Sequence, residues 1–444
     1  MKNRLFSNRQ LVALIIPLVI EQGLTILVGM CDGVMVSSVG EAAISGVSLV
    51  DMINAVILVL FAALATGGAV VTSQLLGARQ VEKARKSAGQ LVTLAGGMGF
   101  IMMALCLTFA RGLLRLFFGS IDQTVMEAGL IYLRITALSF PFIALYNAGA
   151  AIFRSLGNSK VSMQVSLLMN AINVGGNALC IFALKMGVAG VAVPTLVSRA
   201  VAAVLILSLA AKKDQQLRLE RRALYPIDHK MMGSILRIGI PSACENSFFQ
   251  FGRLLVVSMI ALFGTTQTSA NAVANTLDGM AIVVGQAMGL AIVTVIGQCV
   301  GARDQEQAAY YLKKLMAWSW VLLFISNGLI LLFLDQIIGM YRSLTPETVA
   351  LTRTLVWIHC GCAIVMWAAG FVLPNALRAA NDVRFTMWVG IGSMVTFRVF
   401  GSWILCVQLG WGAIGVWIAM ILDWVCRISF FLTRTLSGKW LSKA

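Results

Sequence analysis

The sequence contains little charge. Only 12% of its 444 residues are Asp, Glu, Lys or Arg, about half of the share found in soluble domains. This shortage argues against an ordinary soluble protein, which covers its surface with charged side chains. Apolar residues take their place, with 59% of the chain hydrophobic and a mean hydropathy of +0.88. The composition therefore predicts a protein that crosses a membrane many times.

Apolar runs of about 20 residues, the length that crosses a bilayer, recur from Leu11 almost to the last residue. We predict an all-α integral membrane protein with twelve membrane-spanning helices. The first run continues past Glu21 and Asp32 without a small-residue cleavage site, so we expect it to remain as the first helix. The predicted spans are 11–37, 46–72, 87–112, 124–153, 160–185, 188–211, 233–262, 268–297, 311–334, 346–376, 384–407 and 411–434.

Basic residues account for a formal net charge of +16, and they lie in alternate loops rather than in one patch. Clusters occur at Arg79–Lys86, Lys212–Lys230 and Arg303–Lys314, whereas "GEAAIS" and "GTTQTSA" contain no basic residue. The positive-inside rule then places both termini in the cytoplasm. We expect a multi-pass protein of the bacterial inner membrane, surrounded by lipid and without a nucleic-acid partner.

The sequence also lacks the clusters that mark catalytic, disulfide or metal sites. Its nine cysteines are scattered through the predicted spans without the spacing of a disulfide framework. The dense stretch His359-Cys360-Gly361-Cys362 has no second pair of ligands nearby, which favours packing over a metal site. No nucleophile stands beside a base or metal cluster. We therefore predict no cofactor and no enzymatic activity.

One charged segment occurs twice. "QLLGARQVEKA" at 74–84 returns as "QCVGARDQEQA" at 298–308, and the same offset of 224 residues aligns Pro17 with Pro241 and Glu21 with Glu245. The chain is thus a tandem duplication with six spans in each copy. Because six is even, both copies have one orientation, which predicts two six-helix lobes related by a pseudo-twofold axis along the membrane normal. In the repeated Gln-x-x-Gly-Ala-Arg, we expect Gly to permit a tight exit from the helix.

The duplication divides the chain into an amino-terminal lobe, a cytoplasmic linker and a carboxy-terminal lobe. Such an architecture suits alternating access to a site between the lobes. The predicted boundaries are 1–211, 212–232 and 233–444.

Ionisable residues inside the predicted spans are few, and one that persists in hydrocarbon usually faces a cavity or a partner. Asp423 and Arg427 are four residues apart on one helix, the spacing at which opposite charges meet, so we predict a structural ion pair. Arg253 has two candidate partners, Glu245 two turns earlier and Asp278 on the next helix. The sequence leaves that choice open. The other such residues are Glu21, Asp32, Asp51, Arg199 and Arg398.

Asp32 is the strongest functional candidate among them. It lies in "GMCDGVMVSS", where small neighbours let other helices and solvent approach. The fifth span offers Asn173 and Asn177 one helical turn apart, and the sixth offers Thr195 and Ser198. One carboxylate among neutral oxygens would carry a proton or coordinate a hard monovalent cation.

These residues resemble those of the multidrug and toxic compound extrusion (MATE) family of secondary transporters. The resemblance covers essentially the whole chain. It depends on "VGMCDGVMVSSVG", the repeated Gln-x-x-Gly-Ala-Arg, "FRSLGNSK", the Asn-rich fifth span and "GVAGVAVPTLVS" taken together. The resemblance implies a MATE-type fold and export of organic, often cationic, compounds in antiport with H⁺ or Na⁺. It also implies a monomer that contributes to multidrug efflux and antibiotic resistance.

By the same resemblance, the cation-coupling site consists of Asp32, Asn173, Asn177 and Thr195, which would also bind Na⁺ if sodium is the coupling ion. Many family members have Asp where this chain has Asn177, so the site here has one negative charge where theirs has two. A second family site uses a tenth-span Asp in the sodium-coupled branch. Trp367 aligns with that Asp, so this chain departs from the sodium pattern there.

Five residues are predicted to contact substrate. The family uses a seventh-span Glu, matched here by Glu245, and Asp278 is a further acid that would offer a counter-charge to a cationic compound. For Glu21, a hydrogen bond within the first helix near Pro17 is the alternative. The predicted substrate-binding residues are Glu245, Asp278, Glu21, Trp367 and Arg253.

An alternative function is a flippase for a lipid or lipid-linked precursor, which shares the two-lobe architecture. Such a protein would line its cavity with basic residues for phosphate, and Arg199, Arg253 and Arg398 are available for that role. A channel or receptor is disfavoured by the duplication and by the scarcity of polar rings.

Overall fold

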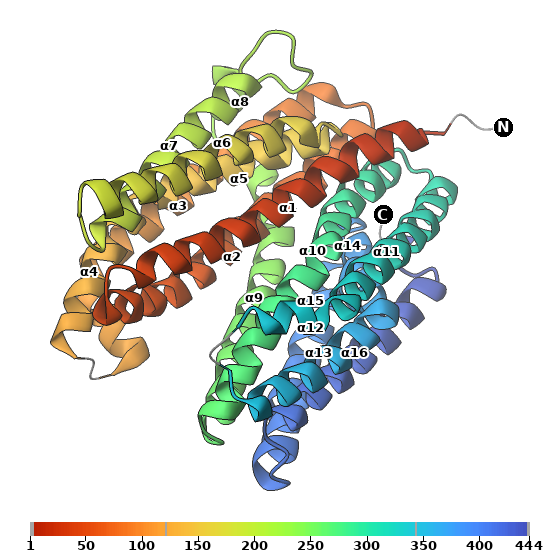
Figure 1. Ribbon diagram of the computed structural model, residues 1–444. Coiled ribbons are helices and arrows are strands. Elements are labelled where there is room, and N and C mark those ends of the chain that lie inside the picture. The colour runs from red at the N-terminus through yellow and green to blue at the C-terminus, as the bar shows by residue number, and fades with distance from the viewer. Residues whose placement is uncertain (1–3, 120–121, 342–343, 442–444) are drawn as a thin grey trace. The chain divides into compact units, whose positions relative to one another are not determined.

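The computed structural model describes residues 4–119, 122–341 and 344–441, and this part of the chain is built from helices joined by short turns. Figure 1 shows their arrangement. The helices of the first half are α1 (Asn8–Ser37), α2 (Glu41–Gly77), α3 (Val81–Phe118), α4 (Gln123–Leu138), α5 (Phe140–Ser155), α6 (Ser159–Ala178), the π-helical η1 (Leu179–Ala183), α7 (Ala189–Ala210) and α8 (Arg221–Leu224).

The second half repeats this series. Its elements are α9 (His229–Ala261), α10 (Thr265–Gly301), α11 (Gln305–Leu332), α12 (Leu334–Gly339), α13 (Pro346–Trp367), η2 (Ala368–Val372), α14 (Leu373–Ala379), α15 (Val383–Ser393), η3 (Met394–Gly401), η4 (Trp403–Gln408) and α16 (Gly412–Leu436).

Ten helical stretches in the described part are long and apolar enough to cross a bilayer, and the bent pair α4 and α5 makes an eleventh if it counts as one span. Each overlaps a predicted span, and several extend beyond the predicted ends by up to six residues. The remaining prediction, 233–262, corresponds to α9, which has 33 residues. Its polar residues, among them Glu245 and Arg253, make it less apolar than the other spans. The all-α membrane architecture is therefore confirmed, with α9 as the one predicted span in the described chain that is not among these apolar stretches.

The break between α4 and α5 has a local cause. The two helices are bent by 44°, and Pro141 lies in the first turn of α5. Because proline has no backbone N–H, it cannot continue the hydrogen-bond ladder of α4. Ser139 lies at the joint, where its carbonyl accepts the first hydrogen bond of α5, from the N–H of Ile143 at 3.0 Å.

The repeated Gln-x-x-Gly-Ala-Arg forms the same helix end in both copies. The left-handed residue is the arginine, with φ of 59° at Arg79 and 54° at Arg303, whereas Gly77 and Gly301 are the last helical residues. The N–H after each arginine bonds back to the last turn, from Gln80 to the Leu75 carbonyl in the first copy. The expectation that glycine makes the exit is therefore wrong.

The chain folds as two compact units, which we call the amino-terminal unit (Asn8–Ala243) and the carboxy-terminal unit (Met1–Ser7 with Cys244–Ala444). They divide inside α9, not at the predicted linker 212–232. That segment packs on the amino-terminal unit instead, where the side-chain amide of Gln90 donates to the carbonyls of Ala223, Leu224 and Pro226.

The start of the described chain belongs to the carboxy-terminal unit. The hydroxyl of Tyr311 in α11 accepts from the N–H of Phe6 at 2.9 Å and donates to its carbonyl at 2.7 Å. Leu5 donates its N–H to the side chain of Gln307 at 2.8 Å. These bonds hold residues 5 and 6 on the first turns of α11.

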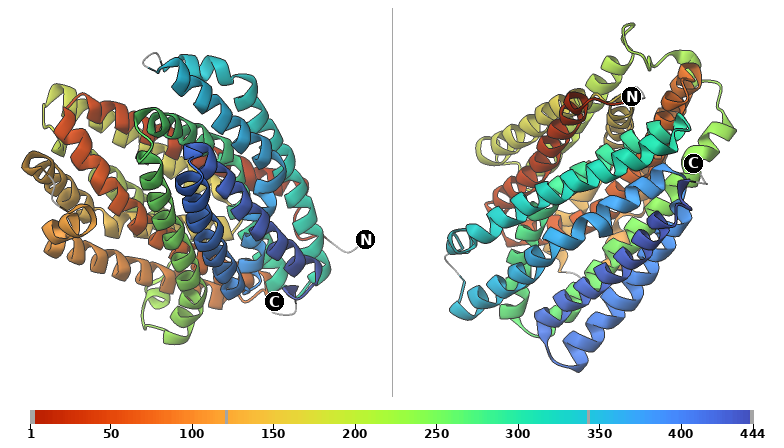
Figure 2. Two further views of the ribbon diagram at one scale, coloured as in Figure 1. Left: turned by 90° about the horizontal axis from the view of Figure 1, so that it is seen from below. Right: turned by 90° about the vertical axis from the view of Figure 1, so that its right-hand side faces the viewer.

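Within each unit, the helices that carry the predicted site residues lie against one another. In the amino-terminal unit, α1 packs on α6 and α6 packs on α7 (Figure 1). In the carboxy-terminal unit, α10 packs on α11, α13 and α14, and α16 packs on α13 and η3 (Figure 2). Both arrangements bring polar side chains from different spans together inside one unit.

Candidate functional site

The four residues predicted to couple the cation form one connected network in the amino-terminal unit. The side-chain amide of Asn177 donates to Oδ1 of Asp32 at 2.7 Å and to Oδ1 of Asn173 at 3.4 Å. Asn173 in turn donates to Oγ1 of Thr195 at 2.9 Å, and the Thr195 hydroxyl donates to the Val191 carbonyl at 2.9 Å. The network joins α1, α6 and α7 around a single carboxylate.

Helix geometry explains the alignment. Asn173 and Asn177 are one turn apart in α6, so both side chains lie on the same face. Both are buried, as is Thr195, whereas Asp32 is only half-buried. The carboxylate therefore lies at the accessible edge of an otherwise enclosed set of amide and hydroxyl groups.

One acceptor in this network has no donor. Oδ1 of Asn177 is fully buried and has no hydrogen-bond partner among the described residues, although a buried carbonyl oxygen normally has one. It belongs to the residue that holds Asp32. A protonated Asp32 would supply the missing donor, and a hard cation would find oxygens from Asp32, Asn173, Asn177 and Thr195 within one network.

A second polar group in this unit contains Asp51, to which the sequence gave no role, and Arg199, which the flippase alternative would place against phosphate. Asp51 of α2 accepts from the side chain of Asn54 at 3.3 Å, and Arg199 of α7 donates to the Ser139 hydroxyl at 2.8 Å. Arg199 interacts electrostatically with both Asp51 and Asp32, yet it lies beyond ion-pair distance of either. Asp32 is therefore not locked to a permanent basic partner within the described chain.

Glu21 is enclosed by its own unit. Its exposed fraction is 5%, and its carboxylate accepts from the hydroxyls of Ser162 at 2.8 Å and Tyr146 at 3.2 Å. Nη1 of Arg154 lies 3.6 Å from Oε1. A role in substrate binding does not fit this geometry, because partners from α5 and α6 already occupy both oxygens. The alternative, a hydrogen bond of the Glu21 carboxylate within α1 near Pro17, is not present either, because its partners come from α5 and α6.

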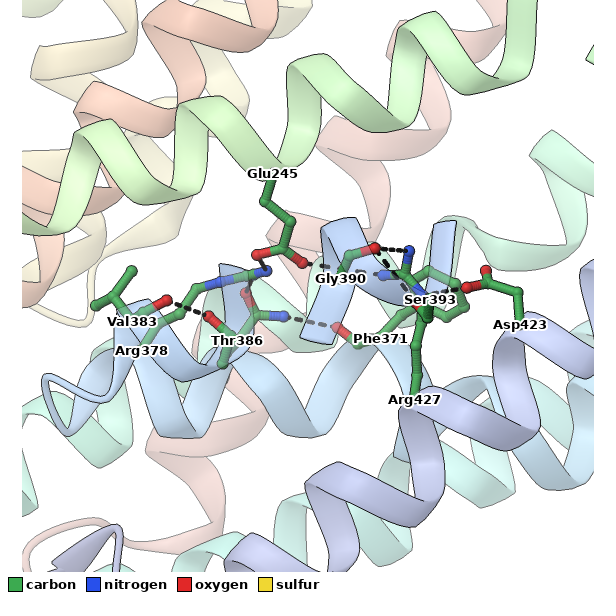
Figure 3. A network of polar contacts seen from close by, with 10 residues as sticks. Glu245, Phe371, Arg378, Val383, Thr386, Gly390, Ser393, Asp423 and Arg427 are labelled. Atoms are coloured by element: carbon green, nitrogen blue, oxygen red, sulfur yellow. Dashed lines mark hydrogen bonds and ion pairs between the residues drawn. The ribbon is translucent and has the colours of Figure 1, made fainter. Parts of the chain in front are cut away.

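Glu245 is enclosed in the same way in the carboxy-terminal unit, as Figure 3 shows. Nη2 of Arg378 donates to Oε2 at 2.7 Å, and Nη1 of Arg427 lies 3.9 Å from Oε1. Arg427 also pairs with Asp423 at 3.0 Å and donates to the Gly390 carbonyl at 3.0 Å. The predicted pair of Asp423 and Arg427 is present, and Glu245 belongs to it rather than to Arg253.

The other predicted substrate residues have separate surroundings. Oδ1 of Asp278 lies 2.6 Å from Nε2 of His359, which is 1% exposed. Sequence reasoning missed this pair, because it treated the histidine as a packing residue. Trp367 is buried, stacks on Phe371 with ring centres 5.1 Å apart and fills the space beside Gly285. It is therefore a core residue, not a residue available to substrate.

Arg253 pairs with neither of its two candidate partners. It is exposed and has no ion pair or hydrogen bond within the described chain. The residues that the structure describes contain no group of three His, Cys, Asp or Glu side chains placed to hold a metal ion.

Comparison with known proteins gives a consistent result. The model of the MatE family matches residues 17–179 and again residues 241–404, once in each copy of the repeat. The chain is 27% identical to the uncharacterized transporter YisQ of Bacillus subtilis, over 96% of this chain and 94% of that protein. It is also 27% identical to the probable multidrug resistance protein NorM of Thermotoga maritima, over 98% and 94% respectively.

Solved structures share the fold. A structure described as the outward-facing conformation of a multidrug resistance MATE family transporter superposes with a TM-score of 0.90 at 22% identity. The similarity covers 98% of this chain and 96% of that one. The two family matches begin 224 residues apart, which is the offset of the internal repeat.

Proposed function

As a member of the MatE family this chain is a membrane transporter, and we propose that it exports small organic compounds in exchange for H⁺ or Na⁺ bound at Asp32. The observation that supports this assignment most is the network of Asp32, Asn177, Asn173 and Thr195, with its unpartnered Asn177 oxygen. A site for one coupling cation needs a carboxylate that can bind H⁺ or Na⁺ and release it again.

Protonation of Asp32 would change the hydrogen bonds of this network. As a carboxylate, Asp32 accepts from the Asn177 amide. As a carboxylic acid, it becomes a donor and would bond to the Asn177 oxygen that now lacks one. The two charge states therefore favour different side-chain arrangements between α1 and α6, which is the differential interaction that a coupled transport cycle requires.

We propose α1 as the element that responds. Pro17 removes one backbone hydrogen bond from this helix. Beyond it, a side chain added at Gly23, Gly29 or Gly33 would meet no atom within 4 Å. The middle of α1 thus has little close packing around these positions. A bend there would transmit the charge state of Asp32 to the substrate-binding face of the amino-terminal unit.

Transport in proteoliposomes tests the proposal. Export of a fluorescent organic dye is measured with a pH gradient alone and with a sodium gradient alone, for the wild type and for Asp32→Asn. We expect the gradient-driven export rate of Asp32→Asn to be at least tenfold lower than that of the wild type. Its unfolding temperature should equal that of the wild type. Glu41→Gln, which removes an exposed carboxylate at the start of α2, is the control. Undiminished coupled export by Asp32→Asn would refute the assignment.

A further inference from the structure

A guanidinium group is buried in the carboxy-terminal unit without an anionic partner. Arg398, in the π-helical segment η3, is 9% exposed. Its Nε has no hydrogen-bond partner, and no carboxylate of the described chain lies within ion-pair distance of the side chain. Its guanidinium lies over the face of the Phe249 ring, 5.6 Å from the ring centre. Enclosed charges normally have a partner, because desolvation without one is expensive.

A second arginine approaches the same point from α9. Gly252 lies directly against the side chain of Met394, so α9 and η3 are in close contact there. Arg253 follows Gly252, and Arg398 follows Met394 by about one turn of the π-helix. The two arginines are electrostatic neighbours. Arg253 is exposed, and since a charge facing hydrocarbon is strongly disfavoured, this exposed edge is expected to face water.

The nearby acids are already engaged. Glu245 pairs with Arg378 and Asp423 pairs with Arg427. Asp278 is closest to His359, whereas it interacts with Arg253 and Arg398 only at longer range. Neutralisation of Asp278 therefore does not account for the two arginines, since Nε2 of His359 lies 2.6 Å from its Oδ1 and neither guanidinium lies within ion-pair distance of it.

The internal repeat shows that this basic site is not a requirement of the fold. At the offset of 224 residues, Arg253 corresponds to Gly29 and Asp278 corresponds to Asn54. Conversely, Asp32 corresponds to Val256. The unpaired acid of the amino-terminal unit, Asp32, therefore has an apolar counterpart in the other unit. The unpaired Arg253 of the carboxy-terminal unit has a glycine as its counterpart.

We propose that Arg253 and Arg398 bind an oxyanion, the carboxylate or phosphate group of a transported molecule. This inference rests on the proposed export function and narrows its substrate class to compounds that carry a negative group. A guanidinium matches the planar geometry of these anions and forms short, charge-assisted hydrogen bonds with them. Nε of Arg398 is the buried donor that lacks an acceptor. Arg253 is exposed and would contact the anion from the solvent-facing side. Purely cationic compounds would be repelled at this site.

A matched pair of dyes tests the proposal by binding alone. The full-length protein in detergent is titrated with a rhodamine whose carboxylate is free and with the methyl ester of the same dye, and fluorescence anisotropy is followed. We expect the free acid to bind at least about tenfold more tightly than the ester, the factor that one charge-assisted hydrogen bond provides. We expect Arg253→Gln and Arg398→Gln to reduce this ratio to about one.

Two further variants control the result. Arg384→Gln removes an exposed arginine near the start of α15 and should keep the wild-type ratio. Arg398→Lys keeps the charge without the fork of donors, and should retain part of the preference. If Arg398→Gln does not fold, Arg253→Gln decides the question, because that side chain is exposed.

The outcomes separate this inference from the proposed function. Equal affinity of the wild type for acid and ester, or a preference that survives both glutamine substitutions, would overturn the oxyanion site without touching ion-coupled export. Binding needs no ion gradient, so loss of coupling would leave this test intact. Competition by short-chain phosphatidic acid, but not by phosphatidylcholine, would identify a lipid phosphate as the natural oxyanion. If short-chain phosphatidic acid does not compete, the oxyanion belongs to a soluble compound.

Discussion

Nη2 of Arg378 donates a hydrogen bond of 2.7 Å to Oε2 of Glu245, and both side chains are shielded from solvent. The equivalent positions of the first repeat, Arg154 and Glu21, form a looser ion pair of 3.6 Å. Each pair connects the first long helix of a copy to the end of its fourth span. The duplication has thus kept an internal ion pair in both units, although their exposed polar sites have diverged.

These pairs differ in how much support they have. Without Arg378, the one ion-pair partner that Glu245 retains among the described residues is Arg427 at 3.9 Å, so Arg378→Gln should lower the free energy of unfolding by about 3–5 kcal/mol. Arg154→Gln should cost less, because Ser162 and Tyr146 still donate to Glu21. Thermal unfolding of the purified variants measures the difference.

A double substitution is the control for this comparison. Glu245→Gln combined with Arg378→Gln removes both charges, and it should recover part of the stability lost in Arg378→Gln, since no unpaired charge remains buried. Equal losses for the two arginine variants would show that the hydroxyl donors around Glu21 do not compensate for its ion pair.

A second carboxylate at the cation site should change its proton affinity. In Asn177→Asp, the new carboxylate would lie beside that of Asp32, at the position from which the amide now donates at 2.7 Å. Two carboxylates in contact cannot both ionise easily, and they share a proton to higher pH. The pH of half-maximal proton-driven export should rise by about one to two units. Export measured against external pH shows the shift.

Asn170→Asp is the matched control for that experiment. Asn170 lies two turns earlier in α6 and contacts Ser166 instead of Asp32. Its substitution by Asp should leave the pH profile in place. Superimposable profiles for the wild type and Asn177→Asp would contradict the role of this network in proton binding.

Asp228, in the connection before α9, should make stability depend on pH. Its Oδ2 lies 2.7 Å from Nζ of Lys86, and its Oδ1 accepts the N–H groups of Lys230 and Met231 at 3.0 Å each. The hydrogen bond from Lys86, with the backbone bond from Met231, holds the pKa of this carboxyl below its ordinary value of 3.8. The stabilisation is therefore fully present above about pH 4 and is lost as pH falls through the lowered pKa.

Asp228→Asn keeps the cap at the start of α9 but removes the ion pair. We expect a lower unfolding temperature than the wild type at pH 6, and a smaller further decrease between about pH 5 and pH 3. Asp214→Asn, which changes an exposed acid of the same connection, should follow the wild-type curve. Parallel curves for Asp228→Asn and the wild type would show that the Lys86 contact does not contribute.

The residues around Asp32 were predictable because each reason for choosing them was local. A carboxylate in an apolar run, two asparagines one turn apart and a threonine in the next span are all visible along the chain. Their contacts span 145 residues between Asp32 and Asn177, but the family pattern already groups them. By contrast, the pair of Asp278 and His359 joins residues that no spacing rule connects.

Glu21, Glu245 and Trp367 were predicted to contact substrate, and the structure instead buries all three. The three predictions share one weakness. Hydropathy and spacing show that a polar or aromatic residue lies within a span, and they do not show which neighbour meets it. Arg154 and Arg378 both stand at the ends of spans, where the sequence does not show whether a basic side chain faces the cytoplasm or the interior. Only the packing of helices turns these arginines inward to the two glutamates.

The sequence by itself determined that the chain is an all-helical membrane protein, that it is duplicated and which stretches contain its spans, because transfer of apolar segments out of water depends on composition along the chain. The tertiary structure decided which charges are neutralised and which remain unpaired. That outcome depends on distances of a few ångströms between side chains from different helices, since electrostatic interaction in a poorly solvated interior changes steeply over such distances. The roles proposed for Asp32 and Arg398 depend on this outcome, because within the described chain the packing provides neither with an oppositely charged partner.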